Sequence, residues 1–168
     1  MTLSSTTVIV ADGPVLLELH FDGVAHIRLN RPKSANGLTI ELLKALHQVV
    51  MQVHGDGRVR AVLITGEGKN FCAGGDVHTF LSKGEDLPHY IRVATSYLQL
   101  VAAGLLRLNP PVVTAVHGFA AGGGGMGSVD PVRHGLPEPD GVPCLFRILL
   151  RMCAFQRLAV QPRVRHQL

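Results

Sequence analysis

The chain has 168 residues, of which 46% are hydrophobic and 17% charged, and its formal net charge is +4. This length suits a single domain with an ordinary buried core, and no apolar run is long enough to cross a membrane. The first residues carry no Lys or Arg before a short apolar patch, so we expect no signal peptide and a cytoplasmic location.

The positive charge is concentrated in the last quarter of the chain. Residues 1–127 carry ten Lys or Arg and nine Asp or Glu, whereas residues 128–168 carry six Arg and three acidic residues. Aromatic residues do not alternate with the basic ones, as a surface that stacks on bases would require. We therefore expect no nucleic-acid partner.

The first predicted elements are a β-hairpin and a helix. Val15–His20 and Val24–Asn30 are β-type runs on either side of Asp22-Gly23, a strong hairpin signal. Thr39 is placed to cap a helix that runs to about His54. Apolar residues recur along that helix at helical spacing, namely Leu42, Leu43, Leu46, Val49, Val50 and Val53.

The following elements alternate between strand and helix. Val59–Thr65 has the composition of a buried strand, and a glycine-containing loop follows it. We then predict a short helix and a longer helix from about Pro88 to Leu108. Val112–His117 is the next buried-type strand. This alternation predicts an α/β fold.

Two glycine-rich loops each follow a buried-type strand. The first is Cys72–Asp76, and the second lies in residues 120–127, AAGGGGMG. Glycines at such junctions let a ligand approach the backbone, and two converging N–H groups can form an oxyanion hole for a carbonyl oxygen. The second loop also fits the dinucleotide pattern G-x-G-x-x-G, but Pro131 interrupts the helix that this pattern needs. A dinucleotide-binding module is therefore a minor alternative.

Four motifs in order resemble the enoyl-CoA hydratase/isomerase (crotonase) superfamily. They are Leu29–Pro32 with Asn36, Val59–Gly66, Asn70–Asp76 and Pro111–Gly124. The resemblance implies a spiral of ββα units and an acyl-CoA thioester substrate, with no cofactor besides the coenzyme A of that substrate. It also implies an enolate-type intermediate in a hydration or isomerisation, as in fatty acid metabolism, and homotrimers or hexamers.

The resemblance also assigns site residues. The backbone N–H groups of Gly75 and Gly123 correspond to the two oxyanion-hole donors of the family. Ala73 and Asp76 fall in the segment that lies along coenzyme A in relatives. Loop packing and helix capping are the alternative roles for Ala73 and Asp76.

The chain departs from the family pattern after its glycines. Hydratases of the family carry a glutamate three residues beyond the second oxyanion glycine, where this chain has Met126, and we find no counterpart of their second glutamate. We divide the chain into a crotonase-like core, 1–127, and an atypical tail, 128–168, with one amphipathic helix at about 144–160. Truncation or a shifted reading frame would explain such a tail, which lacks the family's usual trimerisation region. A catalytically inactive acyl-CoA binder or subunit is therefore the main alternative to an enzyme.

The histidines and cysteines suggest no further chemistry. His47, His54, His78 and His117 are expected to be packed or solvated, and no two histidines stand at a metal-ligand spacing with a carboxylate. The three cysteines form neither a disulfide nor a zinc pattern, and Cys72 is not expected to be a nucleophile. We expect no metal site.

Overall fold

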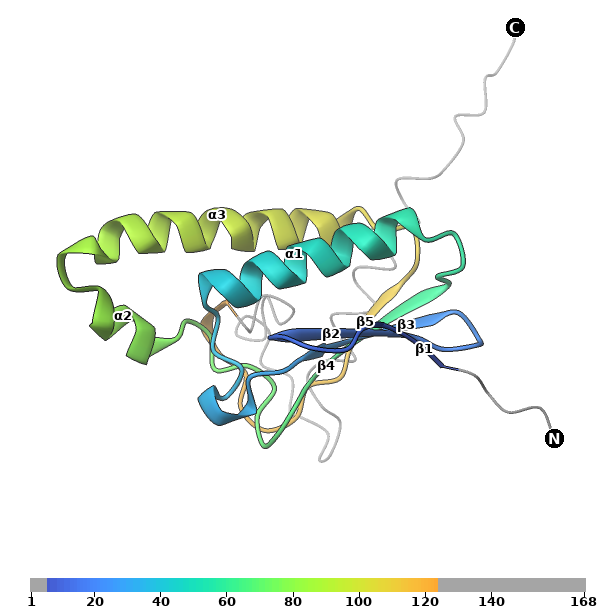
Figure 1. The fold of residues 1–168 in the computed structure, drawn as a ribbon, viewed down its shortest axis with the longest axis horizontal. Helices are drawn as coiled ribbons and strands as arrows, with labels where there is room; N and C mark the ends of the chain where they lie inside the picture. The colour runs from blue at the N-terminus through green and yellow to red at the C-terminus, as the bar shows by residue number, and fades with distance from the viewer. Residues whose placement is uncertain (1–5, 124–168) are drawn as a thin grey trace, which may run out of the picture.

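The computed structural model describes residues 6–123 as a five-stranded sheet with helices on one side (Figure 1). The strands are β1 (Thr7–Val10), β2 (Val15–Leu19), β3 (Val24–Leu29), β4 (Ala61–Gly66) and β5 (Val112–Thr114), and they lie in this order in the sheet. The pairs β1–β2 and β2–β3 are antiparallel, whereas β3–β4 and β4–β5 are parallel. The predicted α/β class is confirmed. Met126 and the helix predicted at about 144–160 lie outside the described residues.

The helices are α1 (Ile40–Gly55), α2 (Val77–Lys83) and α3 (Leu87–Leu106), with short 3-10 turns η1 (Pro32–Ser34) and η2 (Gly84–Asp86). The hydroxyl oxygen of Thr39 accepts the Leu42 N–H at 3.3 Å, which confirms the predicted cap of α1. All six apolar residues predicted for the inner face of α1 are buried. Since α1 covers the sheet and α3 packs along α1, the core lies between α1 and one sheet face (Figure 1).

The two faces of the sheet differ in burial. Val15, Leu17 and Leu19 of β2 are buried, and so are Ala25 and Ile27 of β3. The alternate residues of both strands are only partly buried, as a period of two predicts when one face meets the core. Polar side chains of the hairpin therefore stand on the face opposite α1.

The sequence reading missed β1. Its residues are largely exposed and show no alternation of burial, because among the described strands β1 lies at the edge of the sheet and pairs with β2 alone. Its register shifts between Val8 and Val10, which marks a bulge. Edge strands often carry such irregularities, since they discourage pairing with another chain.

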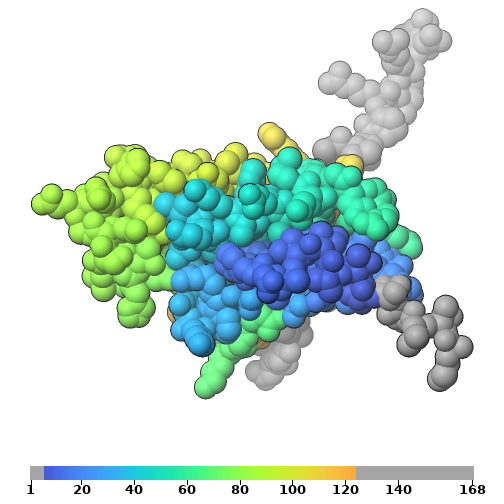
Figure 2. Space-filling model, in the orientation of Figure 1, coloured from blue at the N-terminus to red at the C-terminus, as the bar shows by residue number. Residues whose placement is uncertain are grey.

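The other boundaries shift by a few residues. β4 begins at Ala61 rather than Val59, because its partner β3 begins at Val24, which pairs with Ala61. β5 ends at Thr114 rather than His117, and α3 spans Leu87–Leu106 rather than Pro88–Leu108. Within residues 6–123, no helix combines the length and the hydropathy needed to cross a membrane. Figure 2 shows the α2–α3 end projecting beyond the face formed by β1, β2 and α1.

Candidate functional site

The loops that follow the parallel strands β4 and β5 lie side by side. Backbone N–H groups of the first loop donate to carbonyls of the second, from Phe71 to His117 (2.9 Å) and from Cys72 to Phe119 (3.2 Å). Ala121 N–H donates back to the carbonyl of Cys72 at 3.0 Å. The loops meet because neighbouring parallel strands end at the same edge of a sheet. The structure thus brings together the two glycine loops singled out in the sequence.

Glycine is required where the two loops touch. Gly74 has a φ of +85°, and a Cβ placed there would lie 2.7 Å from the carbonyl oxygen of Ala121. A Cβ on Gly75 would lie 2.5 Å from the Phe80 ring, which itself packs edge-on against Tyr90. Any other residue at these two positions would push the loops or the ring apart.

Apolar side chains surround the two glycines of interest. Leu38 forms an isolated parallel bridge with Gly75, and a Cβ on Gly123 would lie 2.8 Å from Leu38 Cδ1 and 3.1 Å from a methyl group of Leu98. Within residues 6–123, the N–H groups of Gly75 and Gly123 donate no hydrogen bond. Leu38 therefore lies beside both glycines, whose N–H groups are unused donors within the described part of the chain.

Asp76 is the N-cap of α2. Its Oδ1 accepts the Thr79 N–H at 3.0 Å, and its Oδ2 lies 3.0 Å from Nη1 of Arg31. Burial raises the pKa of the Asp76 carboxyl, but the Thr79 N–H and the Arg31 guanidinium outweigh burial and hold the pKa below its ordinary value. Its carboxylate is thus occupied by loop and helix contacts. Ala73 is likewise held in the loop, because its N–H donates to the Ala35 carbonyl at 2.9 Å.

Asn36 organises the first glycine loop, a role that the sequence reading did not assign. Its side chain is fully buried, and its Nδ2 lies 2.9 to 3.0 Å from the carbonyl oxygens of Glu67, Asn70 and Phe71. Its Oδ1 accepts the Arg31 N–H at 2.8 Å. Its φ of 54° is a conformation that asparagine tolerates better than most residues. The signal available in the sequence was an asparagine shortly after Arg31-Pro32, between a strand and a helix.

Cys72 is part of the loop packing. Its side chain is fully buried, and its Sγ lies 3.1 Å from the Asn36 carbonyl oxygen, to which it donates. Burial raises the pKa of the Cys72 thiol above its ordinary value. A protonated, buried thiol is a poor nucleophile, in agreement with the role expected from the sequence.

Two of the four histidines singled out in the sequence form hydrogen bonds to backbone carbonyls. His54 Nε2 lies 3.0 Å from the Gly104 carbonyl oxygen, and His117 Nε2 lies 2.9 Å from that of Gly68. Two histidines that the sequence analysis did not single out lie near a carboxylate in the fold. Folding brings His20 and His26 together with Glu18, with potential ligand atoms within 4.8 Å of one another. Linear spacing missed this group because the strand pairing of the hairpin creates it.

Comparison with known proteins identifies a common family for the region that contains both glycine loops. The profile of the family described as "Enoyl-CoA hydratase/isomerase" matches residues 20–128. The Bacillus subtilis (strain 168) protein YngF, named as an enoyl-CoA hydratase/isomerase, is 36% identical over 111 residues, which are 66% of this chain and 42% of YngF. The 4-chlorobenzoyl coenzyme A dehalogenase-2 of an Arthrobacter species is 33% identical over 106 residues, 62% of this chain and 38% of the dehalogenase.

Solved structures show the same fold. The crystal structure of an enoyl-CoA hydratase from Mycobacterium smegmatis aligns with a TM-score of 0.59 at 32% identity and covers 64% of this chain and 41% of that enzyme. The chain spans about two fifths of the length of these relatives.

Proposed function

Because the chain belongs to the enoyl-CoA hydratase/isomerase family, we propose that it binds an acyl-CoA thioester and stabilises an enolate-type intermediate. The observation that supports this function is the pairing of two glycine loops whose Gly75 and Gly123 N–H groups have no acceptor among residues 6–123. The relatives named above include enzymes that are named for coenzyme A thioesters.

In this proposal the thioester carbonyl oxygen accepts hydrogen bonds from Gly75 and Gly123. As the α-carbon loses a proton or a nucleophile adds to the β-carbon, negative charge develops on this oxygen, and fixed donors stabilise the charge without reorganising. One such donor typically lowers the barrier by about 3 kcal/mol. Leu38, Phe80 and Leu98 lie close to the two glycines, and in this proposal they would shield the acyl group from water.

The segment from Ala73 to Asp76 would lie along the coenzyme A portion. The Asp76 carboxylate is engaged by Thr79 and Arg31, so in this proposal Asp76 holds the loop in place and does not itself contact coenzyme A. The family implies homotrimers or hexamers, and light scattering of the full chain measures which oligomer, if any, it forms.

A second candidate function is acyl-CoA binding without turnover. Met126 stands where family hydratases have a glutamate. General acid–base groups are needed to move the α-proton, so a chain without them would bind substrate and leave it unchanged.

Titration calorimetry of the full chain with but-2-enoyl-CoA, together with an assay of the enoyl thioester absorbance, separates these functions. Binding with loss of the absorbance supports the enzyme, and binding at constant absorbance supports the non-catalytic binder. NAD is the matched nucleotide control, for which we expect no heat of binding. Absence of any binding to but-2-enoyl-CoA and to its saturated analogue would refute both candidates.

A further inference from the structure

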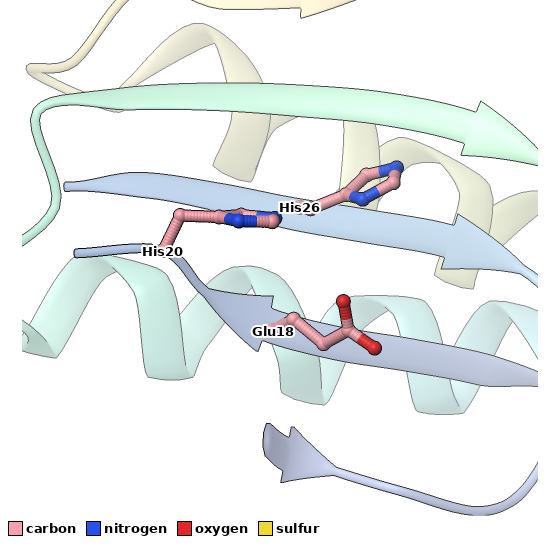
Figure 3. Close-up of side chains that lie close together, drawn as sticks. All are labelled: Glu18, His20 and His26. Carbon is pink, nitrogen blue, oxygen red and sulfur yellow. The ribbon is translucent and has the colours of Figure 1, made fainter. Parts of the chain in front are cut away.

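Three potential metal ligands meet on the outer face of the β2–β3 hairpin. Glu18 of β2 pairs directly with His26 of β3, and His20 follows two residues after Glu18 on the same side of the strand. Figure 3 shows Glu18 on β2, His26 on the neighbouring strand β3 and His20 just beyond the end of β2. We call Glu18, His20 and His26 the hairpin cluster. The two imidazole rings lie 6.0 Å apart between centroids.

Each imidazole of the hairpin cluster has one nitrogen in contact with a hydroxyl group. His26 Nε2 lies 2.9 Å from Thr65 Oγ1, and His20 Nδ1 lies 3.3 Å from Thr6 Oγ1. The remaining nitrogens are His26 Nδ1 and His20 Nε2. A hydrogen bond at the non-ligating nitrogen is the usual arrangement around metal-bound histidine, because it fixes the ring and its tautomer.

The carboxylate of Glu18 also bonds to Arg28, and this contact is the main competing role for the hairpin cluster. Arg28 Nη2 contacts Glu18 Oε1, while Arg28 Nη1 lies 2.8 Å from Glu67 Oε1. One guanidinium is thus shared by two carboxylates, so the group carries an excess of negative charge when both histidines are neutral. The Arg28 contact uses Glu18 Oε1, so within residues 6–123 Glu18 Oε2 is available as a ligand.

We propose that the hairpin cluster binds one divalent transition-metal ion of the zinc class. Two imidazoles and one carboxylate form a ligand set that zinc accepts, with water in the fourth position. Tetrahedral ligation at about 2.1 Å places ligand atoms roughly 3.4 Å apart. The observed limit of 4.8 Å means that the side chains close onto the ion by small rotations.

The metal would join β2 to β3 rather than take part in acyl-CoA chemistry. His20 precedes the turn that leads into the N-terminal end of β3, whereas the glycine loops follow the C-terminal ends of β4 and β5. The proposal does not depend on the proposed function, and the two are tested separately.

Titration calorimetry of the metal-free full chain with ZnCl2 at pH 7 tests the site. We expect one binding event at a stoichiometry of one, weakened at least tenfold in His20→Ala and in His26→Ala. His89→Ala is the matched control, because His89 is exposed on α3, and it should bind zinc as the unsubstituted chain does. Equal zinc affinity in the unsubstituted chain and all three variants would overturn the proposal. Absence of zinc binding to the unsubstituted chain would overturn it too.

Two further measurements keep the test decisive if one variant folds poorly. Glu18→Gln preserves the size of the side chain and should also weaken zinc binding, while circular dichroism reports the folding of each variant. X-ray absorption of the zinc-loaded chain should show two imidazole ligands. A first shell made only of oxygen atoms would contradict the site.

Discussion

The guanidinium of Arg31 and the carboxylate of Asp76 lie 3.0 Å apart, although 45 positions separate the two residues in the chain. The Asp76 side chain is 6% exposed and the Arg31 side chain is 25% exposed. The ion pair links the segment that follows β3 to the N-cap residue of α2. It therefore fixes the end of the first glycine loop, beside Gly75.

Replacing Asp76 should separate its capping role from its charge. Asp76→Ala removes the α2 cap and leaves Arg31 without its carboxylate, so we expect a loss of about 2 kcal/mol in the free energy of unfolding. Asp76→Asn retains an N-cap acceptor and should cost about 1 kcal/mol or less. Urea denaturation at pH 7 measures both values, and equal losses would argue against a separate capping role.

The same pair should contribute to acid sensitivity. Because the folded protein lowers the pKa of Asp76, this group stabilises the fold at neutral pH. This stabilisation is complete above the pKa of Asp76 in the unfolded chain. It is lost as the pH falls from that value through the lower pKa of the folded protein. Asp76→Asn should therefore lose less stability on acidification than the unsubstituted chain does. Urea midpoints at neutral and acidic pH measure this difference, and parallel pH curves would show that Asp76 contributes nothing.

The role of the Gly75 N–H can be tested despite the tight packing at this position. Gly75→Pro deletes the donor but also collides with Phe80, so the test uses Phe80→Ala as background. In that background, Gly75→Ala keeps the N–H and Gly75→Pro removes it. If the chain turns over but-2-enoyl-CoA, we expect Gly75→Pro to lower kcat about 100-fold or more relative to Gly75→Ala. Equal kcat values in the two double variants would exclude Gly75 as an oxyanion donor.

Asn36 should be one of the most sensitive positions for stability. Asn36→Ala leaves three carbonyls without their donor and places alanine at a positive φ, and we expect a loss of about 3 kcal/mol. Glycine adopts a positive φ without strain, so Asn36→Gly removes the backbone strain that alanine would suffer. This substitution should therefore recover about 1 kcal/mol of the lost stability. Chemical denaturation of both variants provides the measurement. A loss below about 1 kcal/mol in Asn36→Ala would show that water replaces the amide.

Cys72 should react slowly with thiol reagents while the chain is folded. In a Cys144→Ser, Cys153→Ser background only Cys72 remains, and its buried, raised-pKa thiol should be labelled at least about 100 times faster in denaturant than in buffer. A chain that also carries Cys72→Ser provides the blank. Rapid labelling in buffer would mean that the loop opens readily.

Much of the fold was predictable because its signals are local. The Asp22-Gly23 turn, the Thr39 cap and the apolar stripe of α1 each act within a few residues and predict their elements to within one or two positions. The glycine loops were recognised as a pair because each follows a buried-type strand. In contrast, β1 carries no alternation, since an edge strand exposes most of its side chains.

The features that the sequence reading missed depend on pairing across the chain. Asn36 gains its importance from three carbonyls that lie more than thirty positions away. The hairpin cluster was implicit in the hairpin prediction, because the Glu18–His26 pairing follows once β2 and β3 are set in register. Examining cross-strand partners, and not linear spacing alone, would have found it.

The parallel arrangement of β3, β4 and β5 has a consequence for the order of folding. Val24 pairs with Ala61, and Val62 pairs with Val112, so each pairing closes a long stretch of chain that includes helix. The antiparallel β2–β3 hairpin has high local contact density and can form on the microsecond scale, whereas these long closures carry an entropic cost that slows folding. Because the two glycine loops come to lie side by side only after both closures, we expect this part of the molecule to form late, when most of the native topology already exists.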